Sequence, residues 1–333
     1  MQVFINTYGS YLHVKEEMFE IRTRPDPKKK DIIKKNHIAA HKITSFVVSK
    51  GAAISTDAVA LALKHNIDIV VVENDGHPLG RFWHSKLGST TKIRKCQLQA
   101  SLDETGLTWV KDWLCTKLNN QAEYLADLRK HRPKVAMTLK KSETRIIEQR
   151  DKIAELKGTC VQDVADTLRG LEGTAGRLYF DGLSLSIAEA FAFKGRSFRP
   201  AADPFNAMLN YAYGILYSRT ERALMLAGLD PYVGFMHRDD YNAKSLVFDY
   251  IEPYRIWAER CVLGMFSKKQ VNKKFFTEMQ SGGISLNPDG KPVLVEQFMR
   301  YLDEDTVRYN GRNLTRYNSM QMAAHNFANK LIS

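Results

Sequence analysis

The 333-residue sequence has few cysteines and no long apolar run, and these two absences exclude several classes of protein. The four cysteines, Cys96, Cys115, Cys160 and Cys261, form no C-x-x-C pair, so neither a zinc knuckle nor a disulfide framework is indicated. We expect buried free thiols in a reducing, cytoplasmic setting. No apolar run approaches the roughly 20 residues that span a bilayer. The N-terminal segment predicts a strand instead of a signal peptide, so we expect no membrane association.

Acidic residues are also scarce relative to basic ones. The chain has 49 Lys and Arg against 37 Asp and Glu, a formal charge of +12 and an isoelectric point near 9.4. The basic residues gather in four runs, "PKKKDIIKK", "RKHRPKVAMTLKKSETR", "FKGRSFRP" and "SKKQVNKK". One such run is typical of a solvated surface, but four runs with this net charge favour a long polyanion such as nucleic acid. No RNA-recognition or zinc-finger signature accompanies them, so direct reading of base sequence is not indicated.

The first ninety residues are rich in strand patterns. Residues 2–21 alternate around Tyr8-Gly9-Ser10, which predicts a hairpin with its turn at these three residues. Apolar and β-branched runs predict strands over 42–49, 67–74 and 76–83. Residues 55–66 carry apolar residues at helical spacing behind Ser55 or Thr56 as the N-cap. The sequence therefore predicts a small module with a mostly antiparallel sheet.

From about Thr91 onward, helix formers with amphipathic spacing dominate and strand patterns become rare. We place the boundary near residues 86–92. The expected fold class is α+β, with a small β-rich N-terminal domain over 1–88 and a larger all-helical domain over 92–333. Within the latter, residues 281–294 predict a polar loop that leads into a short hairpin or another helix.

The segment "SLVFDYIEPYR", residues 245–255, sets two carboxylates in an apolar surrounding. On a helix, Asp249 and Glu252 stand at i and i+3 and share one face. Pro253 has no backbone N–H, so it should leave the Asp249 carbonyl unpaired and bend the helix there. Arg255 could pair with Glu252 or with a substrate phosphate. An acid pair at this spacing is also typical of a solvated helix face.

His237 lies fifteen residues before Glu252 and closes the segment "GLDPYVGFMH". An imidazole beside carboxylates offers nitrogen and oxygen ligands to a divalent ion. Glu172 is the best candidate upstream for a further acid, and it lies in a segment where Gly170, Gly173 and Gly176 recur at every third position. Such glycines allow either helix packing or the close approach of a nucleic acid strand. A lone histidine among apolar residues is more often a core residue than a ligand.

Three segments, "LEGTAGRLYF", "DPFNAMLNYAYGILYSRTERALMLAGLDPYVGFMH" and "SLVFDYIEPYR", together resemble the CRISPR-associated adaptation integrase family, which inserts new spacers into a CRISPR array. The resemblance extends over nearly the whole chain. It implies that Glu172, His237 and Glu252 are both the catalytic residues and the metal ligands, and that Asp249 supports them or serves as an alternate ligand. The implied cofactor is Mg²⁺ or Mn²⁺.

The resemblance also implies a function and partners. It implies a metal-dependent DNA endonuclease and integrase, which joins the 3′-hydroxyl of a captured DNA fragment to a CRISPR repeat by transesterification. Arg255, Lys244 and Arg238 are expected to contact DNA phosphates. Expected partners are double-stranded and branched DNA, a second copy of the chain bound through the N-terminal domain, and a small CRISPR-associated protein ("Cas two") that completes a hetero-hexameric integrase.

A second hypothesis is a non-catalytic nucleic-acid-binding scaffold. In such a scaffold the acids would form structural ion pairs with Arg255 and Arg238. It predicts salt-sensitive binding without metal dependence and without a product.

Overall fold

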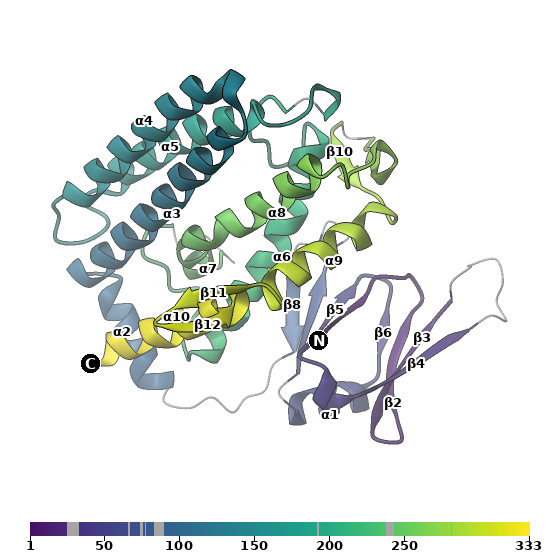
Figure 1. The fold of residues 1–333 in the computed structure, drawn as a ribbon. Helices are drawn as coiled ribbons and strands as arrows, with labels where there is room; N and C mark the ends of the chain where they lie inside the picture. Colours follow the sequence, from purple (N-terminus) through teal and green to yellow (C-terminus); the bar gives the residue numbers. More distant parts are fainter. Residues whose placement is uncertain are drawn as a thin grey trace. The chain divides into compact units, whose positions relative to one another are not determined.

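The chain divides into two compact units, Met1–Gly88 and Ser89–Ser333 (Figure 1). The computed structural model describes residues 1–24, 33–65, 67–73, 76, 78–82, 90–191, 193–237, 243–280 and 282–333. Strands dominate the first unit and helices dominate the second, which confirms the predicted α+β class. The roles assigned to the two halves, dimerisation and catalysis, stay predictions.

The described residues of the unit Met1–Gly88 form two four-stranded sheets, a helix and a 3-10 turn. The first sheet has the strand order β1-β5-β7-β8, and the second has the order β4-β3-β2-β6. The elements are β1 (Gln2–Ile5), β2 (Tyr11–Lys15), β3 (Met18–Thr23), β4 (Lys34–Ala39), η1 (Ala40–Lys42), β5 (Ser45–Ser49), β6 (Ala53–Ile54), α1 (Thr56–Lys64), β7 (Asp68–Val72) and β8 (Pro78–Phe82). Their core is apolar and includes the fully buried Leu12, Phe19, Phe46 and Ile69.

Two predictions for this unit are wrong. The turn at Tyr8-Gly9-Ser10 exists, with Gly9 at φ +77°, but it joins β1 of one sheet to β2 of the other. The hairpin turn lies instead between β2 and β3, where Glu16 and Glu17 adopt φ of 52° and 57°. Glutamate is not a residue that favours positive φ, so no sequence signal marked this turn.

The sheets are also less antiparallel than predicted. β1 with β5, β5 with β7, and β2 with β6 pair in parallel. β2 with β3, β3 with β4, and β7 with β8 are antiparallel. The prediction failed because alternation along a strand does not show which neighbour the strand joins.

The unit Ser89–Ser333 is built from helices that surround a large apolar core. In Figure 1, α3, α4 and α5 lie side by side, and α6 and α8 lie against each other. The helices are α2 (Thr90–Ala100), α3 (Glu104–Lys130), α4 (Ala136–Glu155), α5 (Ala165–Ser184), α6 (Pro204–Leu226), α7 (Ser245–Tyr250), α8 (Arg255–Ser267), α9 (Gly290–Asp303) and α10 (Arg316–Ile332). Short 3-10 turns are η2 (Pro133–Val135), η3 (Glu189–Phe191), η4 (Glu252–Tyr254) and η5 (Lys273–Phe275).

Helix α6 shows why the sequence folds this way locally. Asp203 caps its start by accepting a hydrogen bond from the Asn206 amide, and Pro204 stands at the first helical position, where its missing N–H costs nothing. The helix is buried on nearly all sides, as expected for the centre of a helical domain.

The prediction of an all-helical second domain is wrong in one respect. Two hairpins, β9 (Phe276–Glu278) with β10 (Ile284–Leu286) and β11 (Thr306–Tyr309) with β12 (Arg312–Thr315), interrupt the helices. The second turns at Asn310-Gly311, with φ of 46° and 78°, which is a strong hairpin signal in the sequence. Residues 281–294 hold both predicted alternatives, because β10 is followed directly by α9.

Within the described residues, no helix is long and apolar enough to cross a membrane. The four cysteines are free, as predicted, but they are half-buried instead of buried.

The hairpin turn of the first unit can be tested by replacing Glu16→Asn together with Glu17→Gly. The expected result is a gain of about 1 kcal/mol in the free energy of unfolding, because left-handed backbone costs residues other than glycine about 1–2 kcal/mol. The melting transition of the N-terminal unit, followed by scanning calorimetry of the full chain, measures this gain. A loss of stability would place the turn elsewhere.

Candidate active site

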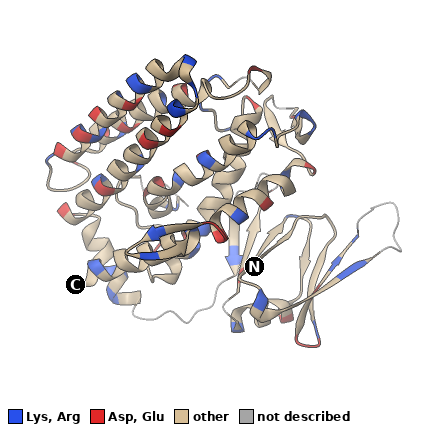
Figure 2. Ribbon diagram, viewed as in Figure 1, with Lys and Arg blue, Asp and Glu red and all other residues tan. Residues whose placement is uncertain are grey.

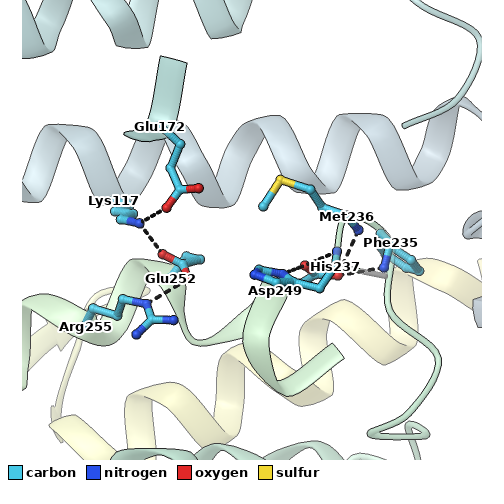
Figure 3. A network of polar contacts seen from close by, with 8 residues as sticks. All are labelled: Lys117, Glu172, Phe235, Met236, His237, Asp249, Glu252 and Arg255. Carbon is cyan, nitrogen blue, oxygen red and sulfur yellow. Dashed lines mark hydrogen bonds and ion pairs between the residues drawn. The ribbon is translucent and has the colours of Figure 1, made fainter. Parts of the chain in front are cut away.

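An ammonium group joins two of the predicted site residues. Lys117 Nζ, on α3, lies 2.5 Å from Glu172 Oε1 on α5 and 2.5 Å from Glu252 Oε2 on η4 (Figure 3). The Lys117 side chain is 10% exposed and that of Glu252 is 3% exposed. The structure thus brings two glutamates that are eighty residues apart in sequence onto one positive charge.

Lys117 was missed by the sequence analysis, although a signal existed. It lies on the buried stripe of α3, which also contains Leu114, Leu118 and Gln121. A lysine that falls on the apolar face of an amphipathic helix needs a partner, because an unpaired buried charge is costly. Helical periodicity alone could therefore have marked it.

Arg255 completes a group of four charges that sum to zero. Its Nε donates to Glu252 Oε1 at 2.7 Å, and its guanidinium lies over the rings of Tyr213 and Tyr217. Burial opposes ionisation of Glu252, but Arg255 and Lys117 outweigh it and lower the pKa of this carboxyl to about 2. Burial and the nearby Arg255 lower the pKa of Lys117, but Glu252 and Glu172 outweigh them and raise it. Glu252, Lys117 and Arg255 therefore stay charged at neutral pH.

Pro253 breaks the helix as predicted. Helix α7 ends at Tyr250, one 3-10 turn follows, and α8 begins at Arg255. The Asn120 side chain donates to the Pro253 carbonyl at 2.8 Å and anchors this turn to α3. The break lets Asp249 and Glu252 serve different partners, although they are only three residues apart.

Asp249 holds the loop that carries His237. Its Oδ2 accepts hydrogen bonds from the amides of Phe235 and Met236, at 2.6 and 3.0 Å. Its Oδ1 accepts from the His237 amide at 3.1 Å and lies 2.5 Å from His237 Nδ1. Figure 3 shows these four contacts fanning out from one carboxylate. With both oxygens engaged in this way, Asp249 supports His237 instead of offering a free ligand atom.

The loop reaches Asp249 because Gly234 lets it pass close to α7. A Cβ at Gly234 would lie 2.4 Å from Ser245 Cβ and 3.0 Å from Asp249 Oδ2. No side chain fits this space, so glycine is required for steric reasons.

The contact with Asp249 also selects the tautomer of the His237 imidazole. When Nδ1 donates to the carboxylate, Nε2 carries the lone pair and can bind a metal or accept a proton. Among the described residues, Nε2 has no hydrogen-bond partner. Burial opposes protonation, but Asp249 and the nearby Glu252 outweigh it and raise the pKa of His237 above its usual value.

A second buried network fixes the helices behind the site. Glu259 on α8 accepts hydrogen bonds from the hydroxyl of Tyr179 at 2.7 Å and from that of Tyr213 at 2.6 Å. Burial raises the pKa of Glu259. Because Tyr179 lies two turns after Glu172 on α5, this network holds α5, α6 and α8 in register around the four charges.

The donor chemistry of these residues fits a hard divalent ion, although the ion-pair arrangement is not itself a metal centre. Glu252 Oε2 is buried and lies beside the ammonium without a well-aligned hydrogen-bond donor. Two carboxylates already share one cation, and an imidazole nitrogen points away from its own anchor. Yet in the described part of the chain no three His, Cys, Asp or Glu side chains gather closely enough to hold a metal ion, because Lys117 stands between the glutamates.

The remaining predicted residues have mixed positions. Lys244 Nζ pairs with Glu221 Oε1 at 2.8 Å, so it and Arg255 both contact glutamates in this structure. Arg238 lies outside the described residues. A Cβ at Gly170, Gly173 or Gly176 would meet nothing within 4 Å, so packing against the described residues does not explain these glycines.

The charge state of Glu252 can be tested by comparing the wild type with Glu252→Gln. A carboxyl whose pKa falls from 4.5 to about 2 on folding stabilises the folded state by about 3 kcal/mol at neutral pH. This contribution is complete above pH 4.5 and is lost as the pH falls toward 2. Urea unfolding at several pH values should therefore show a large difference at pH 7 that shrinks below pH 4.5.

Asp181→Asn is a matched control, because Asp181 is an exposed carboxylate on α5. Its effect should be small at every pH. A Glu252→Gln difference that did not change between pH 7 and pH 3 would contradict the ionised pair.

The sequence and the fold were compared with those of known proteins. A sequence model of the family described as "CRISPR associated protein Cas1" matches residues 3–300. A CRISPR-associated endonuclease Cas1 from Archaeoglobus fulgidus is 32% identical over 317 residues, which cover 92% of this chain and 89% of that protein. A second, from Methanospirillum hungatei, is 34% identical over 242 residues, which cover 72% of this chain and 70% of the relative.

The fold is shared with solved structures of lower sequence identity. A Cas1 protein from Thermotoga maritima superposes with a TM-score of 0.80 at 19% identity, covering 100% of this chain and 97% of that one. A casposase bound to an integration product gives a TM-score of 0.84 at 20% identity, covering 99% of this chain and 90% of that one. The resemblance found in the sequence is therefore confirmed, and the chain belongs to the Cas1 family of CRISPR-associated proteins.

Proposed function

We propose that this protein is a metal-dependent DNA endonuclease and integrase of CRISPR adaptation, which joins the 3′-hydroxyl of a captured DNA fragment to a CRISPR repeat. The relatives named above are endonucleases of this family, and one structural neighbour was solved with an integration product. The observation that carries the proposal is the convergence of Glu172 and Glu252 on one cation, beside a histidine held by Asp249.

Glu172, Glu252 and the Nε2 atom of His237 would hold the ion, and Asp249 would support them. Carboxylate oxygens favour Mg²⁺ or Mn²⁺, and the imidazole shifts the preference toward Mn²⁺. When bound, such an ion acts as a Lewis acid on a phosphoryl oxygen and lowers the pKa of an attacking hydroxyl.

The chain's own residues prepare this site. Asp249 fixes the loop through three backbone amides and the imidazole through Nδ1, so His237 loses little rotational freedom when it binds. Arg255 keeps Glu252 ionised, because it lowers the pKa of that carboxyl. Lys117 balances the charge of both glutamates, which would otherwise repel each other.

The reaction is balanced without a co-reactant. The attacking 3′-hydroxyl gives up its proton and its oxygen forms a new bond to phosphorus, while the bond from phosphorus to the 3′-oxygen of the repeat strand breaks. That leaving oxygen takes up one proton, so no net proton is gained or lost. Water in place of the attacking hydroxyl gives hydrolysis, so the same site accounts for endonuclease activity.

The proposed partners follow from charge and from the named neighbours. The net charge of +12 favours double-stranded and branched DNA. The ribbon of both units carries Lys and Arg positions, blue in Figure 2. One solved neighbour is a Cas6-RT-Cas1–Cas2 complex, with a TM-score of 0.79 at 21% identity over 99% of this chain and 35% of that one. Its name supports a Cas2 partner for this chain. A homodimer formed by the first unit and a hetero-hexameric integrase are further parts of the proposal.

The scaffold hypothesis keeps one supporting observation. Glu252 does pair with Arg255, as a purely structural acid would. Such a scaffold needs no metal and forms no product. An assay for DNA products with and without Mn²⁺ therefore distinguishes the two functions.

Catalysis can be tested with Glu172→Ala and His237→Ala. Both variants should lose joining of a labelled fragment to a repeat-containing plasmid by at least a hundredfold in the presence of Mn²⁺, the order expected when metal-site chemistry is removed. Duplex binding, measured by electrophoretic mobility shift, should change little, because phosphate contacts by Lys and Arg dominate affinity.

Asp181→Asn, an exposed acid on the same helix as Glu172, is the matched control and should join DNA at the wild-type rate. Joining at that rate by Glu172→Ala would contradict the assignment. Absence of any product from the wild type, with or without Mn²⁺, would favour the scaffold.

Competition between Lys117 and the metal gives a separate prediction. The ammonium occupies the space between the glutamates and stays charged, so an added cation must displace it. Lys117→Met should strengthen Mn²⁺ binding by about tenfold or more, because one opposing unit charge is removed. Electron paramagnetic resonance of free Mn²⁺ measures this affinity without any reaction.

Lys111→Met is the control, because Lys111 is also on α3 but donates to the Leu156 carbonyl and not to the glutamates. Mn²⁺ binding that weakened in Lys117→Met would show that the lysine assists the metal instead of competing with it.

A further inference from the structure

A cavity of about 780 Å³ lies beside η4, on the Asn120 and Pro253 side of that turn. Its walls come from α3, α8, the β11–β12 hairpin and α10. The volume falls within the range of about 300–1,000 Å³ that is typical of sites for small or single-residue ligands. None of the residues proposed to hold the metal lines this cavity.

The cavity is rich in aromatic rings. The rings of Tyr254 and Trp257 lie 4.8 Å apart, and those of Trp109 and Trp113 lie 5.9 Å apart. Tyr309 reaches the cavity from the hairpin, where its hydroxyl accepts a hydrogen bond from Asn326 at 3.0 Å. Trp113 is buried, whereas the other four rings are half-buried and offer flat apolar surfaces to a flat ligand.

Polar groups stand among these rings. The side chains of Asp112, Thr116, Arg308, Asn310 and Asn329 line the cavity and form no hydrogen bond or ion pair with other described residues, although the charge of Lys330 acts on Asp112. Lys330 lies at the rim with its ammonium 5.4 Å from the centre of the Trp109 ring. The set offers hydrogen-bond donors and an acceptor for a planar polar edge, together with cations for a phosphate.

Two kinds of ligand suit an aromatic cavity with charged groups at its rim. A cationic side chain of a protein would stack on the rings and pair with Asp112. Two cations, Arg308 and Lys330, stand against this one carboxylate, so the rim attracts an anion more strongly. Rings, amide groups and a cationic rim together are what proteins use to stack unpaired bases and hold the adjoining phosphate.

We infer that this cavity binds one unpaired base of a single-stranded nucleic acid, stacked on Trp257, with the adjoining phosphate near Arg308. The inference rests on the proposed function only in taking nucleic acid as the ligand. Binding of a base needs neither the metal nor strand joining. The inference and the proposed function can therefore be contradicted independently of each other.

The test uses the full chain without added metal and a single-stranded hexadeoxynucleotide that carries one 5-iodouracil. Irradiation should attach the base to an aromatic residue of the cavity, and peptide mass spectrometry locates the adduct. Fluorescence anisotropy of the labelled hexamer measures affinity. Trp257→Leu should weaken binding about fivefold or more, because base stacking on an aromatic ring is worth about 1–3 kcal/mol. Trp257→Tyr should retain most of it.

Two arginines on one hairpin provide the matched pair. Arg308 lines the cavity, whereas Arg312 is exposed on β12 and does not. Each substitution removes one positive charge, so a general loss of attraction is equal in both. Arg308→Ala should weaken hexamer binding several-fold more than Arg312→Ala, and both residues lie on the surface, where substitution leaves folding intact.

Three results would overturn the inference. Equal losses in the two arginine variants with adducts outside the cavity would place the strand elsewhere. Binding of thymidine monophosphate as tight as that of the hexamer would make this a free-nucleotide site. An octa-arginine peptide that bound in the cavity, with no competition from the hexamer, would indicate a protein partner.

Discussion

The ammonium of Lys117 is the contact on which the site's geometry depends. It draws together side chains from α3, α5 and η4, and no other described contact joins Glu172 to Glu252. Burying these charges is costly, and a buried ion pair is weak evidence for stability. Its value here is geometric: it fixes the directions of two carboxylates that would otherwise repel each other. The protein therefore keeps a pair of acids converged in a half-buried place before any ligand arrives.

The two acids of the segment 245–255 have separate tasks. Asp249 accepts hydrogen bonds from the loop that runs from Gly234 to His237, whereas Glu252 pairs with Lys117 and Arg255. The single 3-10 turn started by Glu252 makes this division possible, because it rotates the chain between the end of α7 and the start of α8. A continuous helix would have placed both carboxylates on one face, where they would compete for the same partners.

The sequence allowed much of this to be predicted, and the failures have identifiable causes. The three segments around Glu172, His237 and Glu252 indicated the family, and the break at Pro253 followed from its missing N–H. Lys117 is neither an acid nor a histidine, so a search for metal ligands does not select it. Its position on the apolar stripe of α3 could nevertheless have been predicted from helical periodicity. The parallel pairing of β1 with β5 was not readable, since residues forty apart carry no local signal for it. The turn at Glu16-Glu17 could not be foreseen, because two glutamates at positive φ contradict their own preference.

The turn η4 contributes residues both to the group of four charges and to the aromatic cavity. Glu252 belongs to the group of four charges, whereas Pro253 and Tyr254 line the aromatic cavity, and Asn120 ties the turn to α3. A ligand that displaced η4 when it bound at one of these two sites would change the free energy of binding at the other. Thermodynamic linkage requires this influence to be mutual and equal. A ligand in the cavity would change the affinity of the charged group for a metal ion by the same factor by which the ion changed the affinity of the cavity for its ligand.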